Sequence, residues 1–174
     1  MGQDLKTFTA HYRQEFFQDL KSLRIEAGCL YPLASEHEEE MINLTRRLLE
    51  RGFAYEKLRS VYFDISRFKD YGRLSGVDLS KIREGKTVDL DEYAKENPRD
   101  FTLLKRAKLS ELKSGLYYST PWGKVRPSWH LECAAMALKH PGETVDFHVG
   151  GIESLFPHDE NENALFTAAS GKPL

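Results

Sequence analysis

Cysteine is scarce in this chain, which contains only Cys29 and Cys133 among its 174 residues. Two cysteines cannot supply a disulfide framework, so the sequence favours a reducing compartment. Long apolar runs are missing as well, since no stretch approaches the ~20 residues of a membrane-spanning helix. The first residues, MGQDLKTFTAHYRQ, lack the apolar centre of a secretory signal. We therefore expect a cytoplasmic protein that does not associate with membranes.

An excess of one charge is also missing, because 25 Lys and Arg residues face 27 Asp and Glu residues. The net charge of −2 does not indicate a nucleic-acid-binding protein, although a local basic patch is compatible with it. The hydrophobic fraction of 40% is enough to form a core. The length suits one compact domain or two small units that share an interface.

Apolar residues at helical spacing predict a helix near the N-terminus. Phe8, Tyr12 and Phe16 recur every four residues, which places them on one face of a helix. We expect this helix to end before Gly28 and to pack its aromatic face into a core.

A second helix is predicted between Ser35 and Gly52. Ser35 forms a capping-box pattern with Glu38, and glycine suits the position just after a helix. The following stretch, AYEKLRSVYFDI, predicts a β-hairpin whose second strand alternates between buried and exposed residues. Residues 66–115 are polar and rich in turn residues, which predicts short strands and loops.

The last third of the chain predicts an alternation of helix and strand. PWGKVRP indicates a loop, and the helix after it is expected to stop at Pro141. TVDFHVGG predicts a buried strand that runs into a glycine turn, and FPHDENENALFTAASGK predicts a helix ended by Gly171. This alternation is typical of a doubly wound α/β sheet, in which ligands bind at the ends of strands.

The stretch FPHDENENA carries the candidate chemistry. His158 and Glu162 are four residues apart and share one face of a helix. From these residues alone three interpretations stay open: a metal site, an acid–base pair, or the acidic first turn that complements a helix dipole. Cys133 on the preceding helix is either a third zinc donor or a small buried hydrophobic residue.

Five segments resemble, in the correct order, the cysteinyl-tRNA synthetases, a family of class I aminoacyl-tRNA synthetases. PWGKVRPSWHLECAAMALKH is similar to the family pattern PWG-GRPGWHIECSAM, and DFHVGGIESLFPHDENENA is similar to DIHGGG-DL-FPHHENEIA. The other three segments are YPLASEHEEEMINLTRRLLERGFAYE, SVYFDISRFKDYGRLSG and NPRDFTLLKRAK. The resemblance covers nearly the whole chain and suggests an internal segment of such an enzyme or a divergent paralogue.

The resemblance implies an α/β fold, namely part of a Rossmann-like nucleotide-binding fold with an inserted α+β connective domain. It assigns residues 1–33 to a helix of the nucleotide-binding fold and residues 34–115 to the connective insertion. Residues 116–174 would form the second half of the nucleotide-binding fold and carry the zinc ligands.

The function that the resemblance implies is ATP-dependent activation of L-cysteine and its transfer to tRNA(Cys) in the complete enzyme. A zinc ion would bind the thiolate of the substrate, and three of its ligands would be Cys133, His158 and Glu162. No residue would act as a covalent catalyst. The family also implies two residues of the cysteine pocket, Trp129 and Glu153. Beside the adenylate it implies His148, Gly150 and Gly151.

Several family features do not occur in this sequence. The N-terminal cysteine that is the fourth zinc ligand and the HIGH and KMSKS motifs are absent, so we expect the chain alone to be inactive and to need the remainder of the enzyme. Four positions also depart from the family pattern: Ser128, Val149, Glu153 and Asp159. Two alternatives stay open, a non-catalytic synthetase-like fragment that binds zinc, RNA or a partner, and a mycothiol-type cysteine ligase.

Overall fold

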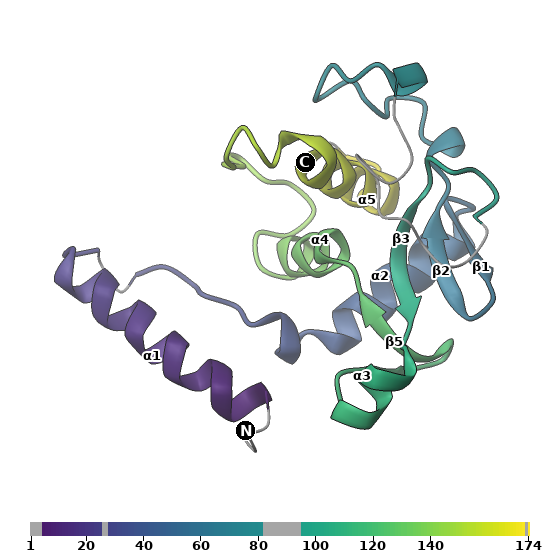
Figure 1. The fold of residues 1–174 in the computed structure, drawn as a ribbon. Coiled ribbons are helices and arrows are strands. Elements are labelled where there is room, and N and C mark those ends of the chain that lie inside the picture. Colours follow the sequence, from purple (N-terminus) through teal and green to yellow (C-terminus); the bar gives the residue numbers. More distant parts are fainter. Residues whose placement is uncertain (1–4, 26–27, 82–94, 173) are drawn as a thin grey trace. The chain divides into compact units, whose positions relative to one another are not determined.

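A computed structural model describes residues 5–25, 28–81, 95–172 and 174 (Figure 1). The chain divides into two compact units, residues 1–32 and 33–174, which are described separately. The first unit contains the predicted N-terminal helix, α1 (Leu5–Ser22). Its aromatic stripe is not buried within this unit, because Tyr12 is 55% and Phe16 46% exposed. The expected core packing is therefore not found within the unit, in whose described residues α1 is the only helix or strand.

The second unit is built on a five-stranded sheet with the order β1-β2-β3-β5-β4, in which every described pairing is antiparallel. The strands are β1 (Ala54–Lys57), β2 (Ser60–Phe63), β3 (Phe101–Arg106), β4 (Tyr118–Thr120) and β5 (Gly123–Pro127). The helices are α2 (Glu38–Glu50), α3 (Leu109–Ser114), α4 (Trp129–Lys139) and α5 (Glu160–Ser170). Helices and strands are thus mixed, as predicted. None of the described helices is long and apolar enough to cross a bilayer.

One hydrophobic core holds the second unit together. Helices α2, α4 and α5 pack on one another, and their apolar faces meet those of β2, β3 and β5 (Figure 1). Leu48, Leu104 and Leu165 are at most 2% exposed, and burying a leucine side chain contributes about 1.5–3 kcal/mol. The core therefore fixes the relative positions of α4 and α5, the helices that carry the candidate site.

The start of α2 differs from the predicted capping box. The N-cap residue is His37 rather than Ser35, and it makes no side-chain capping bond. Its ring instead connects two other segments, because Nδ1 lies 2.7 Å from the carbonyl oxygen of Leu33 and Nε2 lies 2.9 Å from Nε2 of His140. The end of α2 is as predicted, with Gly52 at a φ of +76° just after the helix.

The predicted hairpin is present as β1 and β2, but three predictions about strands are wrong. All four residues of β2 are buried, so this strand does not alternate between buried and exposed residues. The expected loop around residue 124 is strand β5, which pairs with β3 and β4 and buries Val125 completely. The expected buried strand over TVDFHVGG is irregular and exposed, with Phe147 89% and Val149 91% exposed. No described strand lies beside it to accept its backbone hydrogen bonds, and a strand needs such a partner.

Candidate functional site

The candidate site begins where the chain enters α5. The chain is kinked in the segment Leu155–Asp159, which precedes the helix, and Phe156 within it has an extended backbone with φ −137° and ψ 128°. Pro157 stands at the start of the helical run, where its missing N–H costs no hydrogen bond. This geometry places His158 one helical turn before Glu162, as the sequence predicted.

The first acid of α5 has a structural role. Glu160 is completely buried, and its two carboxylate oxygens accept hydrogen bonds from the backbone N–H groups of Gly72 at 2.8 Å and Ser75 at 2.7 Å. The neighbouring Asn161 accepts a hydrogen bond from the hydroxyl of Tyr71. These contacts fasten the loop after β2 to the start of α5, so the two residues are satisfied without a ligand.

The second acid of α5 lies in a different environment. Glu162 is 3% exposed, and its Oε2 atom lies 3.6 Å from Nε2 of His148 and 3.7 Å from Nε2 of His158. Both distances exceed a normal hydrogen bond. Burial, together with the nearby charge of Asp159, raises the pKa of Glu162 to about 7. A buried carboxylate that makes no short hydrogen bond to the two imidazole rings is suited to binding a cation between itself and those rings.

The charge of Glu162 acts on the thiol of Cys133. Burial raises the pKa of the Cys133 thiol to about 12, and the carboxylates of Glu162 and Glu132 act in the same direction. Among the described residues, the three donors whose atoms all lie within 4.8 Å of one another are His148, Asp159 and Glu162. Of the predicted zinc ligands, only Glu162 belongs to this group, so the structure does not bring Cys133, His158 and Glu162 together as one such cluster.

Two aromatic residues at the start of α4 hold His158 in place. The Trp129 ring stacks on it with centroids 3.8 Å apart, and Nδ1 of His130 lies 2.8 Å from Nδ1 of His158. Burial and the neighbouring His158 lower the pKa of His130 to about 4. Either ring can donate the hydrogen bond between them, because the donor depends on the tautomers of the two histidines. The Nε2 atom of His158 faces Glu162.

The glycine turn lies against two carboxylates. A Cβ atom added to Gly150 would come within 2.9 Å of Oδ2 of Asp159, and one added to Gly151 would collide with the carboxylate of the exposed Glu153 unless that side chain moved away. Glycine at these positions therefore allows the side chains to approach the backbone closely. His148, just before the turn, brings its ring to Glu162.

Sequence reasoning missed two members of this cluster. It gave no role to His130, whose only signal is its place beside Trp129 at the start of a helix. Asp159 was recognised only as a departure from the family pattern, yet it is 8% exposed and approaches both Gly150 and Glu162.

The chain is similar to known proteins along its whole length. The family described as tRNA synthetases class I (C) catalytic domain matches residues 1–174. A Cysteine–tRNA ligase from Methanosarcina mazei is 50% identical over 173 residues, which are 99% of this chain and 37% of that protein. A protein of the same name from Chlamydia pneumoniae is 45% identical over 98% of this chain and 36% of its own length. One from Thermococcus onnurineus is 42% identical over 98% of this chain and 35% of its own length. The chain thus spans about a third of the length of these curated relatives.

Proposed function

This chain belongs to the family of class I cysteinyl-tRNA synthetases, and we propose that it forms the cysteine-binding part of a cysteine–tRNA ligase. The complete enzyme would activate L-cysteine with ATP and transfer it to tRNA(Cys) in the cytoplasm. The observation that carries this proposal is the buried carboxylate of Glu162, which faces two histidine nitrogens without a short hydrogen bond and lies near a thiol. We also propose that the chain divides into a helix of the nucleotide-binding fold (residues 1–33), the connective insertion (residues 34–115) and the second half of the nucleotide-binding fold (residues 116–174).

The donor chemistry of the predicted ligands fits a zinc ion, although only Glu162 among them belongs to the donor cluster of His148, Asp159 and Glu162. Cys133, His158 and Glu162 offer sulfur, nitrogen and oxygen donors, all of which bind zinc in proteins. A cation would also offset the cost of the buried Glu162 carboxylate and favour the thiolate form of Cys133. When bound there, zinc would supply a soft Lewis acid that takes the thiolate of cysteine in preference to the hydroxyl of serine.

The remaining residues of the proposed site would orient the substrate. Trp129 would form one wall of the cysteine pocket while its ring holds His158 in position. The carboxylate of Glu153 would bind the substrate ammonium group, and its place over Gly151 shows that it reaches the turn. His148, Gly150 and Gly151 would lie against the adenylate. Positioning of the two reactants, rather than a covalent intermediate, would carry the chemistry.

Cobalt substitution tests the proposed function directly. We expect the chain to bind one Co²⁺ with thiolate-to-cobalt absorption from Cys133, and this absorption should increase when free cysteine is added, but not when serine is added. Cys133→Ser and His158→Ala should each weaken metal binding at least tenfold, since each removes one ligand. Metal binding that neither substitution affects would reject the proposal and favour the non-catalytic alternative.

A separate prediction concerns the residue that orients His158. We expect His130→Ala to weaken zinc binding roughly 10- to 100-fold, the usual effect of losing a partner that orients a metal ligand. His130→Asn keeps a side-chain acceptor and should recover much of this affinity. Competition with a chromophoric chelator measures both values. Equal affinities of the alanine variant and the unmodified chain would show that His130 does not position the ligand.

A further inference from the structure

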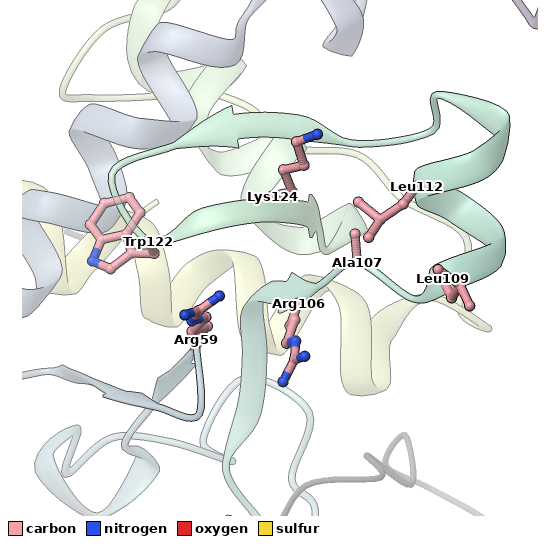
Figure 2. A pocket seen from close by; sticks show the side chains of 7 residues that line it. All are labelled: Arg59, Arg106, Ala107, Leu109, Leu112, Trp122 and Lys124. Carbon is pink, nitrogen blue, oxygen red and sulfur yellow. The ribbon is translucent and has the colours of Figure 1, made fainter.

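The pocket on the sheet does not define a ligand site (Figure 2). It has a volume of about 300 Å³, and its cations are Arg59, Arg106 and Lys124. Their side chains do not converge on one point, as Figure 2 shows, whereas a specific site places a few polar groups around its ligand. The side chain with the clearest need for a ligand is instead a buried carboxylate beside the glycine turn, that of Asp159.

Asp159 carries a charge that the fold does not use. It is 8% exposed and stands at the N-cap of α5, where an aspartate usually accepts a hydrogen bond from the first turn of the helix. Asp159 makes no such bond. Within the part of the chain that the structure describes, its carboxylate also has no other hydrogen bond and no close ion pair. An unpaired buried charge is costly, so this carboxylate is suited to a cation from outside the chain.

The Asp159 carboxylate adjoins both the proposed metal ligand and the glycine turn. Its donor oxygen lies within 4.8 Å of the donor atoms of Glu162 and His148. A Cβ atom added to Gly150 would come within 2.9 Å of Oδ2 of Asp159, so the carboxylate reaches the backbone of the turn. A substrate that binds a metal at Glu162 and extends toward this turn would therefore lie beside Asp159.

We propose that Asp159 binds the α-ammonium group of the cysteine substrate. The inference rests on the proposed function, in which the metal holds the substrate thiolate. Only the β-carbon and the α-carbon separate that sulfur from the ammonium nitrogen, so a thiolate fixed near Glu162 keeps the ammonium close to Asp159. An ammonium donates charge-assisted hydrogen bonds to a carboxylate, and in a buried site these bonds are stronger than in water. Asp159 thus distinguishes cysteine from a thiol that has no amino group.

Glu153, the other carboxylate proposed for this role, lies in a different environment. Its side chain is exposed and lies against Gly151, and exposed ion pairs contribute little. The family pattern has aspartate at the position of Glu153 and histidine at that of Asp159. This chain therefore carries one carboxylate more than the pattern near the turn, and the additional one is buried. Asp159 contributes the larger share of ammonium binding, and Glu153 contributes a smaller one.

Ligand preference in the Co²⁺-loaded chain tests this assignment. β-Mercaptopropionate, which is cysteine without its amino group, binds a metal through the same thiolate. We expect the unmodified chain to bind cysteine roughly 10- to 100-fold more tightly than β-mercaptopropionate, the effect of hydrogen bonds to a charged group. The increase in thiolate-to-cobalt absorption on titration measures both affinities. Asp159→Asn should abolish most of this preference without weakening the binding of β-mercaptopropionate, because that anion gains nothing from a facing carboxylate.

Further measurements separate substrate binding from metal binding and from folding. Asp146→Asn removes an exposed carboxylate two residues before His148 and should leave the preference unchanged. The Co²⁺ affinity and the thermal midpoint of Asp159→Asn should not fall, because asparagine keeps the size of the side chain and Asp159 makes no capping bond. An unchanged preference, equal losses for both thiols, or a loss of Co²⁺ binding in Asp159→Asn would overturn the assignment and leave the proposed function standing. If cysteine caused no increase in absorption in the unmodified chain, the assignment and the proposed function would both be rejected.

Discussion

Replacing Glu160 with alanine should lower the free energy of unfolding by about 3 kcal/mol. The carboxylate accepts hydrogen bonds from two backbone N–H groups, and each bond to a charged group contributes roughly 1.5–3 kcal/mol. In the alanine variant the N–H groups of Gly72 and Ser75 would lose their acceptor, and a cavity would remain. Urea denaturation followed by far-UV circular dichroism measures the difference.

Glutamine at the same position is the matched control. Glu160→Gln keeps the volume and one carbonyl oxygen, so it should lose less than the alanine variant while still being destabilised. Its amide NH₂ would face a backbone donor where the carboxylate presented an acceptor. A change below roughly 0.5 kcal/mol in the alanine variant, typical of an unimportant surface position, would contradict the structural role of Glu160.

The contrast between Glu160 and Glu162 follows from helix geometry. Successive residues are about 100° apart around an α-helix, so two residues separated by one position point to nearly opposite sides. Glu160 thus reaches the loop that contains Gly72, whereas Glu162 reaches His148 and His158. Sequence alone identified the face shared by His158 and Glu162, because spacing within one helix fixes it. It could not say which neighbour each acid meets, because those contacts come from distant segments.

The dependence on contacts with distant segments also explains which helices and strands the sequence predicted. Helices α2, α4 and α5 were recognised because their apolar period is local. Strand β5 was missed, since Pro121 and Gly123 suggest a loop, and its pairing with β3 depends on residues about twenty positions away. The predicted strand over TVDFHVGG failed for the opposite reason: its composition favours a strand, but no described strand lies beside it. Propensity therefore predicts a strand only where a pairing partner exists.

The second large effect is expected from Glu162→Gln, measured as the response of stability to zinc. If zinc binds the folded state alone, a concentration 1,000-fold above its dissociation constant adds about 4 kcal/mol to the free energy of unfolding. Glu162→Gln removes an anionic ligand and should abolish most of this gain. Without zinc the variant should be no less stable than the unmodified chain, because the carboxylate is buried without a short hydrogen bond.

Glu132→Gln is the matched control, because it also removes a carboxylate charge that acts on the thiol of Cys133. It keeps all three proposed ligands, so the stabilisation by zinc should persist. Thermal unfolding with and without zinc distinguishes the two variants. If Glu162→Gln retained the zinc response, Glu162 would not be a ligand. If it instead destabilised the zinc-free chain as much as Glu160→Ala, both acids would be structural and the chain would carry the family motif without its metal chemistry.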